Sequence, residues 1–184
     1  MDITLSWDLF VIVFFAMVIA YSFIIGKHES VKIIIATYIA TVAVQGIGNI
    51  LMRLTGDSQP ILVVLGLSID STLLATIKLV IFVAIIIFIV VRSGIEVEYS
   101  KDTNGVLNTL ITGVFGFATA GLLLSTLLTF VAGGPILDAG LAETVNVSVI
   151  VQQSKLMQLM ILNQDLWFCL PAILLIGVGL LSSE

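Results

Sequence analysis

Residues 5–25 read LSWDLFVIVFFAMVIAYSFII, and only Ser6, Asp8 and Ser22 interrupt this apolar stretch. An α-helix rises about 1.5 Å per residue, so about 20 apolar residues cross the hydrocarbon core of a bilayer. The stretch meets that length. Three more stretches do so, at residues 31–52, 72–91 and 106–132. The sequence therefore predicts an all-α chain, a polytopic transmembrane bundle with four spans.

The composition supports the same fold class. Of the 184 residues, 59% are hydrophobic and 10% are charged, whereas soluble domains are about 25% charged. A chain of this size cannot bury so much apolar surface in its own core. The lipid bilayer is therefore the first expected partner. Nucleic acid is not expected as a partner, because the net charge is −5 and no basic patch stands out.

The rest of the chain carries shorter apolar segments. We divide the whole chain into a transmembrane domain of four helices, residues 1–132, and an extracytoplasmic loop with a C-terminal hydrophobic helix, residues 133–184. Residues 60–69 are too short to span, so they are re-entrant, interfacial or a packed loop. Residues 145–151 alternate like a strand and are interpreted as a connector.

The C-terminal segment, residues 166–181, allows two interpretations. Asn163, Gln164 and Asp165 separate it from the apolar residues 156–162. It is either a fifth spanning helix or an interfacial helix with a bend at Pro171.

The distribution of basic residues predicts the orientation in the membrane. Loops facing the cytoplasm carry more Lys and Arg than loops outside. The first and third loops hold four such residues, against two in the second and fourth loops. We therefore expect the N-terminus outside, and no cleaved signal, since no basic residue precedes the first helix. The residues are Lys27, Lys32, Arg92 and Lys101 on one side, and Arg53 and Lys155 on the other.

A polar stripe follows the second predicted helix. Its members recur every four residues, and in hydrocarbon such side chains should face other helices or a wet cavity. In one interpretation Gln45 and Asn49 are hydrogen-bonding contacts between helices. In the other, the stripe lines a pathway for a solute or an ion. The stripe consists of Thr37, Thr41, Gln45, Asn49 and Arg53.

Lys78 and Asp8 form a second polar pair of interest. Each lies near the start of a helix that runs inward, so the two are expected at the same depth. An unpaired charge in the membrane costs a few kcal/mol or more, so we predict a partner for Lys78. Asp8 and Asp70 are the candidates. Alternatively, the long stem of Lys78 lets its ammonium group reach the headgroups.

The fourth predicted helix is rich in small residues, which let helix backbones approach closely in lipid. We expect one ladder to pack inside the chain and the other to be available to a partner, either a second copy or another membrane protein. The packing positions are Gly105, Gly113 and Gly121 on one ladder, with Thr109 and Phe117, and Gly116 on the other, with Thr112 and Ala120.

The sequence contains no recognisable catalytic set. His28 is the single histidine, and it lies beside Lys27 and Glu29 in a predicted short loop. No cluster has the spacing of metal ligands, and no nucleophile has an obvious base. We therefore expect no enzyme activity, no catalytic residues, no metal and no cofactor.

Three local features accompany the helix pattern. They are Trp7-Asp8 and Gly26-Lys27-His28-Glu29 around the first helix, Asp102 before the glycine-rich helix, and Ser154-Lys155-Leu156 leading to Leu170-Pro171. In these features the chain resembles the colicin V production protein (CvpA) family of bacterial inner-membrane proteins. The resemblance marks Asp8, Gly26, Asp102, Gly113 and Gly116 as structural positions.

The resemblance implies a multi-pass protein of the bacterial inner membrane. It also implies a non-enzymatic, accessory or scaffold role in envelope function, secretion or toxin export. The alternative function is a small channel or transporter subunit, with its pathway along the polar stripe.

Overall fold

The computed structural model describes residues 7–55, 71–92, 105–132 and 154–182. Within these residues all regular structure is helical, as predicted. The predicted segments at residues 60–69 and 145–151, together with Asp70 and Asp102, lie outside the described residues. The helices are α1 (Trp7–Thr55), α3 (Ser71–Arg92), α4 (Gly105–Ala132), α7 (Lys155–Leu162) and α8 (Gln164–Ser182).

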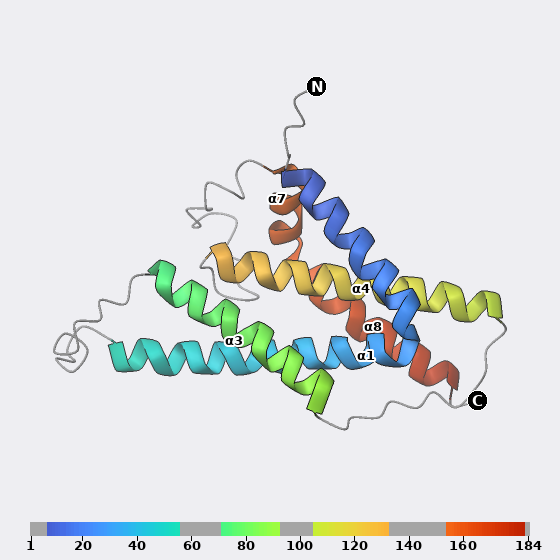
Figure 1. The fold of residues 1–184 in the computed structure, drawn as a ribbon, viewed down its shortest axis with the longest axis horizontal. Helices are drawn as coiled ribbons and strands as arrows, with labels where there is room; N and C mark the ends of the chain where they lie inside the picture. Colours follow the sequence, from blue (N-terminus) through green and yellow to red (C-terminus); the bar gives the residue numbers. More distant parts are fainter. Residues whose placement is uncertain (1–6, 56–70, 93–104, 133–153, 183–184) are drawn as a thin grey trace.

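Helix α1 consists of two arms that meet at a sharp bend at Gly26 (Figure 1). Gly26 has φ 83° and ψ 176°, a backbone region that is almost restricted to glycine. Apart from the neighbouring residues of α1 itself, no atom of the described residues lies within 4 Å of where a Cβ would be, so the requirement for glycine is conformational. The Ser30 hydroxyl donates to the Gly26 carbonyl at 2.9 Å. The first arm (7–25) and the second arm (27–55) are therefore joined without a loop, and the predicted short loop at Lys27, His28 and Glu29 is wrong because these residues are helical.

Helix α4 is the centre of the bundle. It packs against both arms of α1 and against α3, α7 and α8 (Figure 1). In the apolar stretch of α4, 72% of the residues are buried. In the apolar stretches of α1 and α3 the buried share is 11%. Yet α4 has the lowest mean hydropathy of the three, 2.0 against 2.7. Placing the least apolar helix inside suits a lipid environment, where small and hydroxylated residues form the helix contacts.

The helix ends form two groups on opposite sides of the bundle, one toward the lower right of Figure 1 and one toward the upper left. One end holds the Gly26 bend, the C-terminal ends of α3 and α8, and the N-terminal end of α4. The other end holds both ends of α1, the start of α3, the end of α4, and α7. Successive arms and helices therefore run in alternating directions, as in an up-and-down bundle.

The C-terminal segment bends at Asn163 and not at Pro171. Helices α7 and α8 meet there at 66°, and the Asn163 side chain caps α7 by donating to the Leu159 carbonyl at 2.8 Å. Pro171 lies inside a continuous α8. The Tyr38 hydroxyl donates to the carbonyl of Phe168, three residues before the proline. The interpretation with a bend at Pro171 is therefore not supported, because α8 continues through the proline and the break in this segment lies at Asn163.

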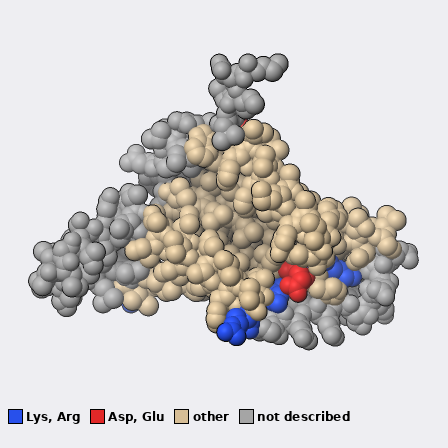
Figure 2. Space-filling view, viewed as in Figure 1, with Lys and Arg blue, Asp and Glu red and all other residues tan. Residues whose placement is uncertain are grey.

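Three helices are long and apolar enough to cross a membrane, namely α1, α3 and α4, or up to four if the bent α7–α8 pair counts as one span. On the face shown in Figure 2 most of the described surface carries no charge, and most of the charged side chains visible there lie along the lower edge. These features are compatible with a multi-pass membrane protein.

Candidate functional site

The Asp8 carboxylate lies at the N-terminus of α7. Its Oδ1 atom accepts hydrogen bonds from the Ser154 hydroxyl at 2.5 Å and from the Leu156 N–H at 3.1 Å. Ser154 is the N-cap of α7, and its hydroxyl also accepts from the Met157 N–H at 3.1 Å. The first N–H groups of a helix have no partner inside it and favour an anion. Asp8 thus joins the start of α1 to a helix that is far away in the sequence.

Lys78 does not form the predicted ion pair with Asp8. Instead its side chain crosses the second arm of α1 at Gly48. A Cβ at Gly48 would lie 2.5 Å from Lys78 Cε and 3.2 Å from its Nζ. Helix α3 packs on the second arm, through Phe82 against Val44, and this position separates Lys78 from Asp8. Gly48 provides the space through which the lysine stem runs.

The polar stripe of α1 divides into a buried half and an exposed half. Thr37 and Thr41 are buried, and each hydroxyl donates to the carbonyl four residues earlier, at 2.7 Å. Gln45, Asn49 and Arg53 are exposed. A four-residue step turns about 40° past one full helical turn, so the stripe drifts from the interior to the surface. It lies only partly between the described helices.

The glycines of α4 differ in what they contact. A Cβ at Gly116 would lie 2.8 Å from Ser22 Cβ and 3.2 Å from Ile19 Cα, so the first arm of α1 touches the α4 backbone. At Gly113 a Cβ would lie 3.0 Å from the tip of Phe23. At Gly105 no atom of another described helix lies within 4 Å of that position, because this residue begins the helix on its exposed side. Its predicted role in packing has no counterpart in the described residues.

Gly121 contacts a residue that the sequence analysis missed. The six-membered ring of Trp167 lies where a Cβ of Gly121 would be. The same indole packs against Phe15 and Phe117, with ring centroids 5.8 and 5.6 Å apart. A tryptophan in an apolar helix gives no indication of which glycine it will cover, so the sequence could not pair them.

A buried polar contact joins α4 to α8 just after the bend at Asn163. Gln164 Nε2 donates to Thr129 Oγ1 at 3.0 Å, and Thr129 Oγ1 donates to the Ser125 carbonyl at 2.8 Å. Gln164 is 4% exposed. A buried amide in an apolar segment requires a partner. The position of Gln164 next to the apolar residues of α8 was the one feature of the sequence that indicated such a contact. It holds the start of α8 on α4.

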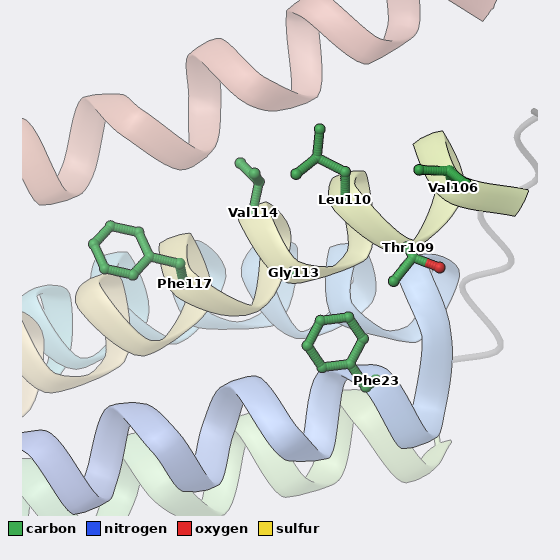
Figure 3. A pocket seen from close by; sticks show the side chains of 7 residues that line it. All are labelled: Phe23, Val106, Thr109, Leu110, Gly113, Val114 and Phe117. Carbon is green, nitrogen blue, oxygen red and sulfur yellow. The ribbon is translucent and has the colours of Figure 1, made fainter.

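An open groove lies between the first arm of α1 and the N-terminal half of α4 (Figure 3). Its volume is about 590 Å³. Among the described residues that line it, Thr109 supplies the one side-chain hydroxyl, which donates to the Gly105 carbonyl at 2.9 Å. None of these described residues is charged. Its lining is Phe23, Val106, Thr109, Leu110, Gly113, Val114 and Phe117.

Comparisons with protein-family models, with curated proteins and with solved structures find no match to this chain.

Replacing Asp8 with alanine is expected to loosen α7 from α1, because the Ser154 hydroxyl and the Leu156 N–H lose their acceptor. Asp8→Asn should have a smaller effect, since it keeps an oxygen acceptor but loses the charge. The measurement is maleimide labelling of Met157→Cys, a position that is 1% exposed, in a Cys169→Ser background. Labelling should become faster in the order aspartate, asparagine, alanine. Equal rates in all three would contradict a role of Asp8 in holding α7.

Proposed function

We propose that this chain is a non-enzymatic, multi-pass protein of the bacterial inner membrane. It acts as an accessory or scaffold component in envelope function, secretion or toxin export, as its resemblance to the colicin V production protein family implies. Its four spans are the two arms of α1, α3 and α4. The bent α7–α8 pair completes the bundle.

The observation that carries this proposal is how the buried polar side chains are used. Thr37 and Thr41 bond to their own helix, and Gln164 bonds to Thr129 on the next. A solute pathway needs polar groups that remain available to replace the hydration of the solute. Among the described residues, most of the buried hydroxyls and the Gln164 amide bond to their own helix or to a neighbouring one, whereas Asn108 Oδ1, Ser125 Oγ and Trp167 Nε1 are buried without a partner. This favours a scaffold over a pathway inside one chain.

The orientation follows from the charges at the two ends of the bundle. Lys27, Lys32 and Arg92 lie at the end with the Gly26 bend, whereas Arg53 and Lys155 lie at the other. Because cytoplasmic loops carry the excess of Lys and Arg, the bend faces the cytoplasm. The N-terminal end of α1 then lies outside.

The orientation is tested by labelling single cysteines in intact cells, in a Cys169→Ser background. Lys155→Cys should react with a membrane-impermeant maleimide, and His28→Cys should react only after the membrane is permeabilised. The opposite pattern would reverse the orientation.

The scaffold role is tested in two further experiments. Deleting the gene should produce an envelope or export defect that the wild-type gene corrects. The purified protein in liposomes should give no solute flux above that of empty liposomes. A deletion without phenotype, together with robust flux from the purified protein, would overturn the scaffold role in favour of a channel or transporter subunit.

A further inference from the structure

The outward face of the second arm of α1 differs from the other exposed apolar faces of the bundle. Its centre is a row of residues spaced by three and four, which we call the outer seam. This spacing is that of a helix that pairs with another helix along its length. The outer seam consists of Ile39, Val42, Gly46, Asn49 and Arg53, all of them exposed.

Three residues at the outer seam do not fit a face that meets only lipid. Gln45, beside the seam, and Asn49 expose carboxamides one helical turn apart, and neither side chain hydrogen-bonds within the described part of the chain. Gly46 lies between them, and no atom of another described helix lies within 4 Å of its Cβ position. Gly48, in contrast, makes room for Lys78. In a bilayer, amide side chains form hydrogen bonds between helices, and small residues are typical of positions where two helices approach closely.

Helix α3 provides a face for comparison. Val80, Val83 and Ile87 follow the same spacing and are 59%, 40% and 57% exposed. These three positions carry no amide and no glycine. Such a row can face lipid without leaving a polar group unpaired.

We propose that the outer seam pairs with the same seam of a second copy of this chain. Copies in one membrane share one orientation, so a two-fold pair places the two helices parallel. Each residue of the seam then meets its own equivalent. A carboxamide contains both a donor and an acceptor, so the Asn49 side chain can hydrogen-bond to Asn49 of the other copy. Gln45 lies beside the seam, at the edge of the same contact. Gly46 lets the two backbones approach, and Arg53 lies at the helix end, where water and ions screen its charge.

The pairing rests on the proposed membrane location, and cysteine cross-linking in native membranes tests it. In a Cys169→Ser background, Val42→Cys, at a position that is 71% exposed, should form a disulfide-linked dimer under mild oxidation. Ile87→Cys on α3 is the matched control and should not. Equal cross-linking at the two positions would overturn the proposal, as would an adduct whose mass is not that of two copies.

A second variant tests the amides themselves. Adding Gln45→Leu and Asn49→Leu to Val42→Cys should weaken dimer formation about tenfold, since hydrogen bonds between membrane helices contribute modestly. The control is Ile47→Leu with Ile50→Leu, which should change nothing. Unchanged dimer formation in the amide variant would overturn the proposal.

Extraction with alkaline carbonate separates the two proposals. Loss of the wild-type chain from the membrane pellet would overturn the membrane location and the pairing together. Retention in the pellet without cross-linking at Val42→Cys would overturn the pairing alone.

Discussion

Replacing Gly116 with valine is expected to force α4 away from the first arm of α1. A Cβ there would lie 2.8 Å from Ser22 Cβ and 3.2 Å from Ile19 Cα. The Ile19 atom belongs to the backbone, so no change of rotamer relieves the overlap. Overpacking of this kind costs about 3 kcal/mol, whereas the gain in helix propensity over glycine is about 0.3 kcal/mol.

Thermal unfolding of the purified protein in a mild detergent measures this effect. Gly177→Val on α8 is the control, because no atom lies within 4 Å of a Cβ at Gly177. It should change the free energy of unfolding by less than about 1 kcal/mol. A similar loss of stability in the two variants would show that valine acts through the helix itself and not through the contact of α4 with α1.

The helices of this chain could be predicted closely from the sequence. Residues 72–91 and 106–132 were expected to be helical, and the structure has Ser71–Arg92 and Gly105–Ala132. The length of an apolar stretch is a local property, and local properties are what a single sequence shows. The small-residue ladder also indicated that α4 approaches other helices closely, but not which helix meets which glycine.

The contacts between distant residues could not be predicted. Asp8 accepts a hydrogen bond from Ser154, 146 residues away. From the sequence, Ser154 indicates at most the start of a helix and not which carboxylate it contacts. The pairing of Lys78 with Gly48 depends on which arm of α1 carries α3. Depth in the membrane suggested Asp8 as the partner of Lys78, but depth does not determine which helices are neighbours.

The helix breaks were predicted from residue type, and these predictions were only partly right. Gly26 was expected to end the first helix, and it does, as a single-residue bend. A bend at Pro171 was one of the two interpretations of the C-terminal segment, but α8 continues through Pro171 and the break lies at Asn163. A proline removes one backbone donor, and whether the helix bends depends on partners that come from elsewhere in the fold.

Replacing Trp167 with alanine is expected to destabilise the junction of α4, α8 and the first arm of α1. The side chain is 9% exposed and packs on Phe15, Phe117 and the backbone at Gly121. Its removal from a soluble core would cost about 3–5 kcal/mol. In lipid the term for transfer from water is largely lost but the packing term remains. We therefore expect about 2–3 kcal/mol, measured as loss of unfolding free energy in detergent.

Trp7 provides the control for that substitution. It is the other tryptophan of the chain and is 37% exposed at the start of α1. Trp7→Ala should cost less than about 1 kcal/mol, since an exposed side chain leaves no cavity behind. If Trp7→Ala destabilised the protein as much as Trp167→Ala, the loss would not come from the packing around Gly121.

A double-mutant cycle with Gly121 decides whether Trp167 acts through its contact with α4. Gly121→Ala alone should cost about 1–2 kcal/mol, because the new Cβ would lie 2.5 Å from Trp167 Cζ3 and the indole would have to move. In the Trp167→Ala background the added methyl group enters the space that the indole left. The double variant should therefore be at least as stable as Trp167→Ala alone, which gives a coupling energy of about 1–2 kcal/mol. If the two costs simply added, the indole and the α4 backbone would not be in direct contact, and the stability lost in Trp167→Ala would have to come from Phe15 and Phe117 instead.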